Sequence, residues 1–181
     1  MEVNSFSNAQ FTPLIISVLL LVLSVLLFSR KRNISLFFLF SGALFIGFFI
    51  ANLNPFLEIW DEQYHALVAK NLSMDFLNPV LLRNPTFEYN SNNWTENSVW
   101  LHKQPLFLWH IAASVKLFGP TVLAVRLPSI IMHAIIPLFI YRIGKVVITE
   151  RAGFFGAVFF TLAYFPLELI AGRFSTDHND V

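Results

Sequence analysis

The sequence lacks cysteine and is poor in charged residues, and both features restrict what the protein can be. Without cysteine, the chain forms neither a disulfide framework nor a thiolate metal site. Charged residues make up 13% of the chain, which is about half of their share in soluble domains. The formal net charge is +1, so the chain has no basic field for nucleic acid and no acidic tail. An ordinary soluble domain, a disordered chain and a secreted mini-protein are therefore excluded.

Hydrophobic residues are abundant instead. They make up 56% of the chain, which contains 21 Phe and has a mean hydropathy of +0.63. A helix that crosses the bilayer core needs about 20 mostly apolar residues. Four stretches approach that length, at about residues 11–29, 34–53, 122–143 and 152–171. These runs predict an all-α, polytopic membrane protein with four spans.

A fifth apolar stretch, Pro105–Phe118, is too short to cross the membrane. As a helix it would be about 21 Å long, whereas the bilayer core is about 30 Å thick. Pro105 suits the first position of a helix, because the N–H that proline lacks has no partner there. We expect an interfacial or re-entrant helix.

The basic residues between the apolar runs predict the orientation. Arg30-Lys31-Arg32 form one short connection, and Arg142, Lys145 and Arg151 surround another. The positive-inside rule assigns both connections to the cytoplasm. The loops at 54–120 and after 172 then share the outer side. We expect two transmembrane helices in 1–53, an outer loop with amphipathic juxtamembrane helices in 54–120, and two further spans with the start of a second outer loop in 121–181.

The outer loop opens with Trp60-Asp61-Glu62. Apolar residues then recur at helical spacing, which predicts an amphipathic helix that lies at the membrane surface. Asp61 suits an N-cap of this helix. It also suits a functional carboxylate at the membrane–water boundary, and the two interpretations are compatible. The apolar stripe comprises Tyr64, Leu67, Val68 and Leu72.

Two basic residues border apolar segments. Lys103, next to His102, precedes the short helix and suits either a snorkelling lysine or a phosphate contact. Arg126 lies near the start of the third run, and ionisable groups inside membrane spans are costly and frequently functional. Snorkelling is the alternative for Arg126. In the last segment, Asp177 and Asp180 suit acid–base chemistry, a metal or a solvated loop.

Taken in order, several motifs resemble the membrane glycosyltransferases that use polyprenyl-phosphate-linked sugars. These GT-C enzymes of family 39 include the protein O-mannosyltransferases and the lipid A aminoarabinose transferases. The resemblance covers about Ile59 to Val181. Because such enzymes have many more spans, it implies that the chain is the N-terminal part of one. The motifs are Trp60-Asp61-Glu62 with Asn71-Leu72, Lys103-Gln104-Pro105-Leu106 with Trp109, Leu117-Phe118-Gly119 followed by Ala124–Ser129, and Asp177–Asp180.

The resemblance implies transfer of a sugar, with inversion, from a polyprenyl-phosphate carrier to a lipid, glycan or protein acceptor. Asp61, with Glu62, would deprotonate or orient the acceptor hydroxyl. Lys103 and Arg126 would bind the donor phosphate. The second site carboxylate would come from the acidic segment, as either Asp177 or Asp180.

Two residues depart from the family pattern. Many relatives have an acidic residue at the position of His102, and some place a metal ligand there, so a divalent metal at His102 stays open and no cofactor is assigned. Gln104 separates Lys103 from Pro105, which are often contiguous in the family.

The expected location is a bacterial inner membrane with the catalytic loops on the outer side, where membrane lipids are further partners. The alternatives are a non-catalytic membrane subunit, a lipid-binding protein or an inactive fragment.

Overall fold

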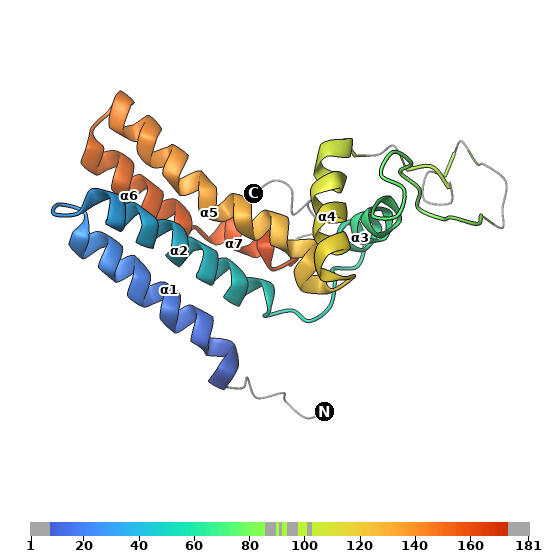
Figure 1. Cartoon of the computed structure of the whole chain (residues 1–181), viewed down its shortest axis with the longest axis horizontal. Helices are drawn as coiled ribbons and strands as arrows, with labels where there is room; N and C mark the ends of the chain where they lie inside the picture. Colours follow the sequence, from blue (N-terminus) through green and yellow to red (C-terminus); the bar gives the residue numbers. More distant parts are fainter. Residues whose placement is uncertain (1–7, 86–89, 91, 94–97, 101–102, 174–181) are drawn as a thin grey trace. The chain divides into compact units, whose positions relative to one another are not determined.

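The computed structural model describes residues 8–85, 90, 92–93, 98–100 and 103–173 (Figure 1). Within these residues the fold is helical, apart from an isolated antiparallel bridge between Val80 and Val99. The predicted all-α class is confirmed. The chain divides into two compact units. Unit 1 comprises residues 1–54, 129–171 and 181, and unit 2 comprises residues 55–128 and 172–180.

Three of the described helices are long and apolar enough to cross a membrane. They are α1 (Asn8–Leu27), α2 (Arg32–Ala51) and α5 (Val122–Val147). A fourth candidate is the pair α6 (Glu150–Thr161) and α7 (Tyr164–Ile170), if the two count as one span. The chain is accordingly an integral, multi-pass membrane protein.

The fourth apolar run is not the single helix that its length suggested. It breaks between Thr161 and Tyr164, and the two halves are bent by 42°. Pro166 explains the position of the break. Proline has no N–H to donate to the carbonyl of residue 162, and its ring collides with that carbonyl in a continuous helix.

Unit 1 is held together by small and hydroxyl-bearing residues. Between α1 and α2, Ser24 Oγ donates to the Ser35 carbonyl (2.8 Å) and Ser35 Oγ donates to the Ser24 carbonyl (2.7 Å). Between α5 and α6, a β-carbon added at Gly144 would collide with Gly153. Small residues and interhelical hydrogen bonds are what bring helices together in lipid, where the hydrophobic effect gives no net attraction between them.

The two basic connections lie at the same end of unit 1. Arg32, at the start of α2, forms an ion pair of 2.7 Å with Glu150, at the start of α6. The turn before α2 and the turn before α6 are therefore neighbours. Their assignment to the cytoplasmic side stays a prediction.

Unit 2 is built on α3 (Asp61–Leu72) and α4 (Pro105–Phe118). The short helix has the predicted bounds, with Pro105 in its first turn. The predicted apolar stripe of α3 is only partly correct, because Val68 and Leu72 are buried but Leu67 is exposed. The core of this unit joins both helices to the first turn of α5 and to the loop before α4, through Val68, Leu72, Trp100, Leu108, Ile111, Val115 and Val125.

Candidate functional site

The start of α3, in unit 2, positions Asp61. The N-cap position is held by Trp60, without a side-chain cap bond, and Asp61 is the first helical residue. The N-cap interpretation of Asp61 is therefore wrong. Trp60 has φ 114°, a conformation that non-glycine residues rarely adopt and that costs on the order of 1–3 kcal/mol. Such strain concentrates at functional sites.

The Asp61 carboxylate is half-buried. Within the described part of the chain it has neither a hydrogen bond nor an ion pair. The helix N-terminus favours its anion. Asp61 therefore offers an uncommitted carboxylate.

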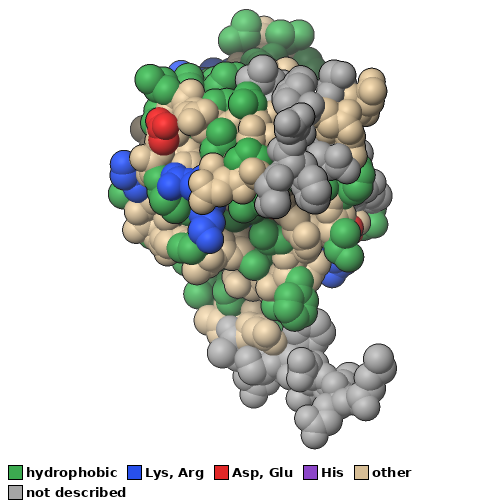
Figure 2. All heavy atoms as spheres, turned by 90° about the vertical axis from the view of Figure 1, so that its right-hand side faces the viewer, with side chains coloured by type: hydrophobic (Ala, Val, Ile, Leu, Met, Phe, Trp, Pro, Cys, Tyr) green, Lys and Arg blue, Asp and Glu red, His purple; other side chains and the backbone are tan. Residues whose placement is uncertain are grey.

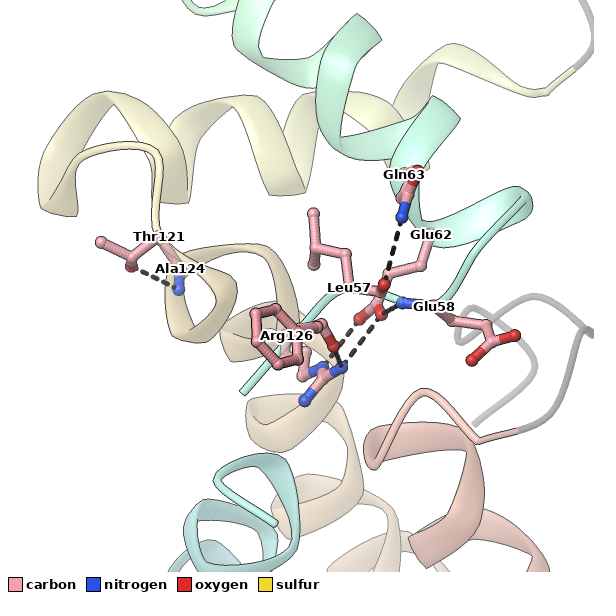
Figure 3. Close-up of polar contacts among 8 residues, drawn as sticks. Leu57, Glu58, Glu62, Gln63, Thr121, Ala124 and Arg126 are labelled. Carbon is pink, nitrogen blue, oxygen red and sulfur yellow. Dashed lines mark hydrogen bonds and ion pairs between the residues drawn. The ribbon is translucent and has the colours of Figure 1, made fainter. Parts of the chain in front are cut away.

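The neighbouring Glu62 is fully committed. Arg126 Nε donates to its Oε1 (2.7 Å), and Arg126 Nη2 donates to its Oε2 (3.0 Å). The backbone N–H of Glu58 adds a third bond, of 2.7 Å to Oε2. Figure 3 shows the Arg126 guanidinium of α5 directed at this carboxylate. The pair is buried, with exposures of 0% for Arg126 and 3% for Glu62, and the bidentate geometry offsets the cost of burying both charges.

Glycine at position 172 is required by this ion pair. Gly172 has φ 64° and begins the second-loop segment of unit 2. A β-carbon there would lie 2.6 Å from Glu62 Oε2 and 2.7 Å from Arg126 Nη2. The entry to the second loop is thus packed directly on the pair. The sequence analysis did not identify Gly172 as a constrained position. Its place just after an apolar run could have indicated a tight turn there.

Lys103 borders a cavity of about 440 Å³ in unit 2. The cavity is lined mainly by aromatic and apolar side chains. Two of these are fixed to each other, since Trp109 Nε1 donates to the Phe76 carbonyl (2.8 Å) and the two rings stack. A lysine beside an apolar cavity suits a ligand with an anionic head and a hydrocarbon tail. The lining includes Lys103, Gln104, Phe76, Trp100, Leu108 and Trp109.

A row of aromatic rings connects the start of α3 to this cavity. Trp60 meets Tyr64 edge-on, and Tyr64 stacks on Trp100 at a centroid distance of 5.3 Å. Trp100 is buried and lines the Lys103 cavity. Among the described contacts, these rings are the link between the start of α3 and the Lys103 cavity. Sequence reasoning did not single out Trp100, because its distance along the chain from Tyr64 hides the stacking.

Three predicted site residues, His102, Asp177 and Asp180, lie outside the described residues. Among the residues that are described, no group of three His, Cys, Asp or Glu side chains is arranged to hold a metal ion.

Unit 2 also exposes large apolar side chains. Phe56, Ile59 and Leu77 are each exposed by 76% or more. On the face drawn in Figure 2, hydrophobic side chains are widespread and charged ones are few. Exposed apolar patches of this kind are typical of a surface that meets a membrane or a partner. The described chain is thus a multi-pass membrane protein whose second unit contains Asp61, Lys103 and the Glu62–Arg126 ion pair.

Part of the chain matches the model of a known protein family. Residues 102–180 match the model of the family described as dolichyl-phosphate-mannose-protein mannosyltransferase. This confirms the predicted resemblance for the part of the chain that contains Lys103, Arg126 and the acidic segment. The match covers less than half of the chain, so it shows that this part is similar to a family whose description names a lipid-phosphate-linked sugar. Asp61 and Glu62 precede the matched region. No curated protein and no solved structure matches the chain.

Proposed function

We propose that the protein takes part in transferring a sugar from a polyprenyl-phosphate carrier to a hydroxyl acceptor at the membrane surface. The family match over residues 102–180 carries this proposal. In the proposed step, the acceptor oxygen attacks the anomeric carbon of the sugar while the bond from that carbon to the phosphate oxygen breaks. The acceptor loses a proton, the carrier leaves as polyprenyl phosphate, and the anomeric configuration inverts.

Asp61 is the proposed general base. It receives the proton of the acceptor hydroxyl, and a carboxylate is the stronger base when no cation is paired with it. The contrast with Glu62 supports this choice, because Glu62 has three hydrogen bonds and Asp61 has none among the described residues. A second carboxylate, from Asp177 or Asp180, completes the proposed site.

Lys103 is the proposed contact of the donor phosphate. Negative charge grows on the phosphate oxygens as the bond to the sugar breaks, and a fixed cation stabilises it. The adjoining aromatic cavity supports this role, because it gives the hydrocarbon next to the phosphate an apolar surface.

Arg126 is the residue whose proposed role the geometry changes. The resemblance implied a phosphate contact, but the guanidinium binds Glu62 through Nε and Nη2 and also donates to the Phe56 carbonyl (3.0 Å). We therefore assign Arg126 and Glu62 to positioning. They hold the start of α3, and with it Asp61, against α5.

The test is transfer in membranes of the native host, where both carrier and acceptors are present. Radiolabelled sugar is loaded onto the lipid carrier and chased into product. Asp61→Asn removes the base but keeps the shape, and we expect the rate to fall about 100-fold or more. Asp75→Asn, at an exposed carboxylate of the same unit, is the matched control and should leave the rate unchanged. Full activity of Asp61→Asn, at normal abundance in the membrane, would exclude Asp61 as the base.

A further inference from the structure

A groove on unit 1, remote in sequence from the candidate site, has the features of a second binding site. Its volume is about 370 Å³. Four apolar side chains from α2 and α5 form its walls, and Phe37 among them is 63% exposed. Tyr141 and Arg142 lie at its polar end. The lining residues are Leu36, Phe37, Phe40, Leu138, Tyr141 and Arg142.

The groove opens beside the basic end of unit 1. Six basic residues belong to the two neighbouring turns and helix ends, and Glu150 is the carboxylate among them. Glu150 is already occupied by Arg32 (2.7 Å), Lys145 (3.0 Å) and the Tyr141 hydroxyl (2.6 Å). It is therefore not available to neutralise further cations. The six are Arg30, Lys31, Arg32, Arg142, Lys145 and Arg151.

Arg142 is the cation that faces the groove. Its side chain is exposed, and among the described residues it makes no hydrogen bond or ion pair. An arginine at the end of a membrane helix extends its guanidinium to headgroup depth. Arginine also binds phosphate in a bidentate manner. The groove thus places the Arg142 guanidinium, which can bind phosphate, next to an apolar wall at the depth of lipid acyl chains.

We infer that this groove binds an anionic phospholipid of the cytoplasmic leaflet. The headgroup phosphate binds Arg142, and one acyl chain lies against Phe37, Phe40 and Leu138. Basic pockets between transmembrane helices on the cytoplasmic side are a recurrent form of anionic-lipid site. The positive-inside rule assigns this end of the helices to that side.

Two other occupants fit the observations less well. The acyl chain of a zwitterionic lipid would also pack against the apolar wall. The ammonium group of its headgroup, however, would be repelled by the six basic side chains. A second copy of the chain would need a carboxylate opposite Arg142. In the described part of unit 1 the carboxylates are Glu150, which has three partners, and Glu168, which lies at the far end of the bent α6–α7 pair.

The test compares phosphatidylglycerol with phosphatidylcholine of identical acyl chains. Each lipid is titrated into the purified full chain in detergent, and bound lipid is counted by native mass spectrometry. We expect phosphatidylglycerol to bind about tenfold more tightly, because the trimethylammonium group of phosphatidylcholine competes with Arg142 for the phosphate that both lipids carry. Arg142→Gln should abolish this preference and Arg142→Lys should keep most of it. Arg151→Gln, a basic residue at the same end that does not line the groove, is the matched control and should keep it entirely.

Three results would overturn the inference. Equal affinities for the two lipids would exclude a site for anionic headgroups. Equal losses in Arg142→Gln and Arg151→Gln would mean diffuse attraction rather than a site. A dimer that phosphatidylglycerol does not dissociate would make a second copy the occupant. None of these measurements depends on sugar transfer, so they test the groove independently of the proposed function.

Discussion

At the scale of single residues, the adjacent carboxylates of Asp61 and Glu62 have different surroundings. Glu62 points into unit 2 and is held there by Arg126, whereas Asp61 is half-buried without a described partner. Neighbouring groups in a helix point in different directions, so consecutive acidic residues acquire different surroundings. This division of roles was not visible in the sequence. The sequence indicated that Asp61, Glu62 and Arg126 matter, but not that the last two bind each other.

The buried pair gives a prediction at this scale. Arg126→Met leaves the Glu62 carboxylate buried without its cation, and we expect a loss of about 3–5 kcal/mol in the free energy of unfolding. The double variant Glu62→Leu/Arg126→Met removes both charges and should recover most of that loss. Chemical denaturation in detergent measures both. A single-variant loss below about 1 kcal/mol would contradict the buried pair. Sugar transfer by the double variant separates positioning from phosphate binding, since only positioning predicts recovered activity.

At the scale of elements, the sequence predicted helices better than their connections. The first three long apolar runs each form one helix, and Pro105–Phe118 has the bounds that its proline and following glycine suggested. The break in the fourth run and the exposure of Leu67 were not predicted. Both depend on what a segment packs against, which spacing along the chain does not reveal. The turn at Gly172 belongs to the same group, because its constraint comes from residues 46 and more positions away.

That turn provides a matched comparison of two glycines with positive φ. Gly119 has φ 82° and open space around its Cα, whereas Gly172 has φ 64° and the ion pair against it. Gly119→Ala should cost about 1–3 kcal/mol for the backbone alone, because φ 82° with ψ 168° is a conformation essentially restricted to glycine. Gly172→Ala should cost a further 1–3 kcal/mol or so, because the added methyl must displace Glu62 or Arg126. Denaturant midpoints of the two variants measure the difference. Equal losses would show that Gly172 does not pack on the pair.

At the scale of the whole molecule, the chain divides into two compact units. Unit 1 contains most of the long apolar helices, and unit 2 contains Asp61, Lys103 and the Glu62–Arg126 ion pair. Hydropathy and charge alone were sufficient to predict the membrane class and the number of apolar runs. They were not sufficient to divide the chain, because α5 begins in unit 2 and continues into unit 1.

The orientation of the chain can be tested with single introduced cysteines, because the sequence contains no cysteine that would have to be removed first. We expect Asn92→Cys, in the outer loop, to react with an impermeant maleimide in intact cells. Asn33→Cys, beside the basic turn, should react only after the cells are permeabilised. Both asparagines are exposed, so access to reagent is matched. The reverse pattern would invert the predicted topology.

The tryptophans give the two units different optical properties. Trp60, Trp94, Trp100 and Trp109 all belong to the sequence of unit 2, and unit 1 contains none. Tryptophan fluorescence, excited at wavelengths that tyrosine does not absorb, therefore originates in unit 2 alone, whereas far-ultraviolet dichroism comes chiefly from the long helices. Heating a single sample and recording both signals would reveal whether the units melt together. The protein thus carries its own spectral label on the unit that holds the candidate site.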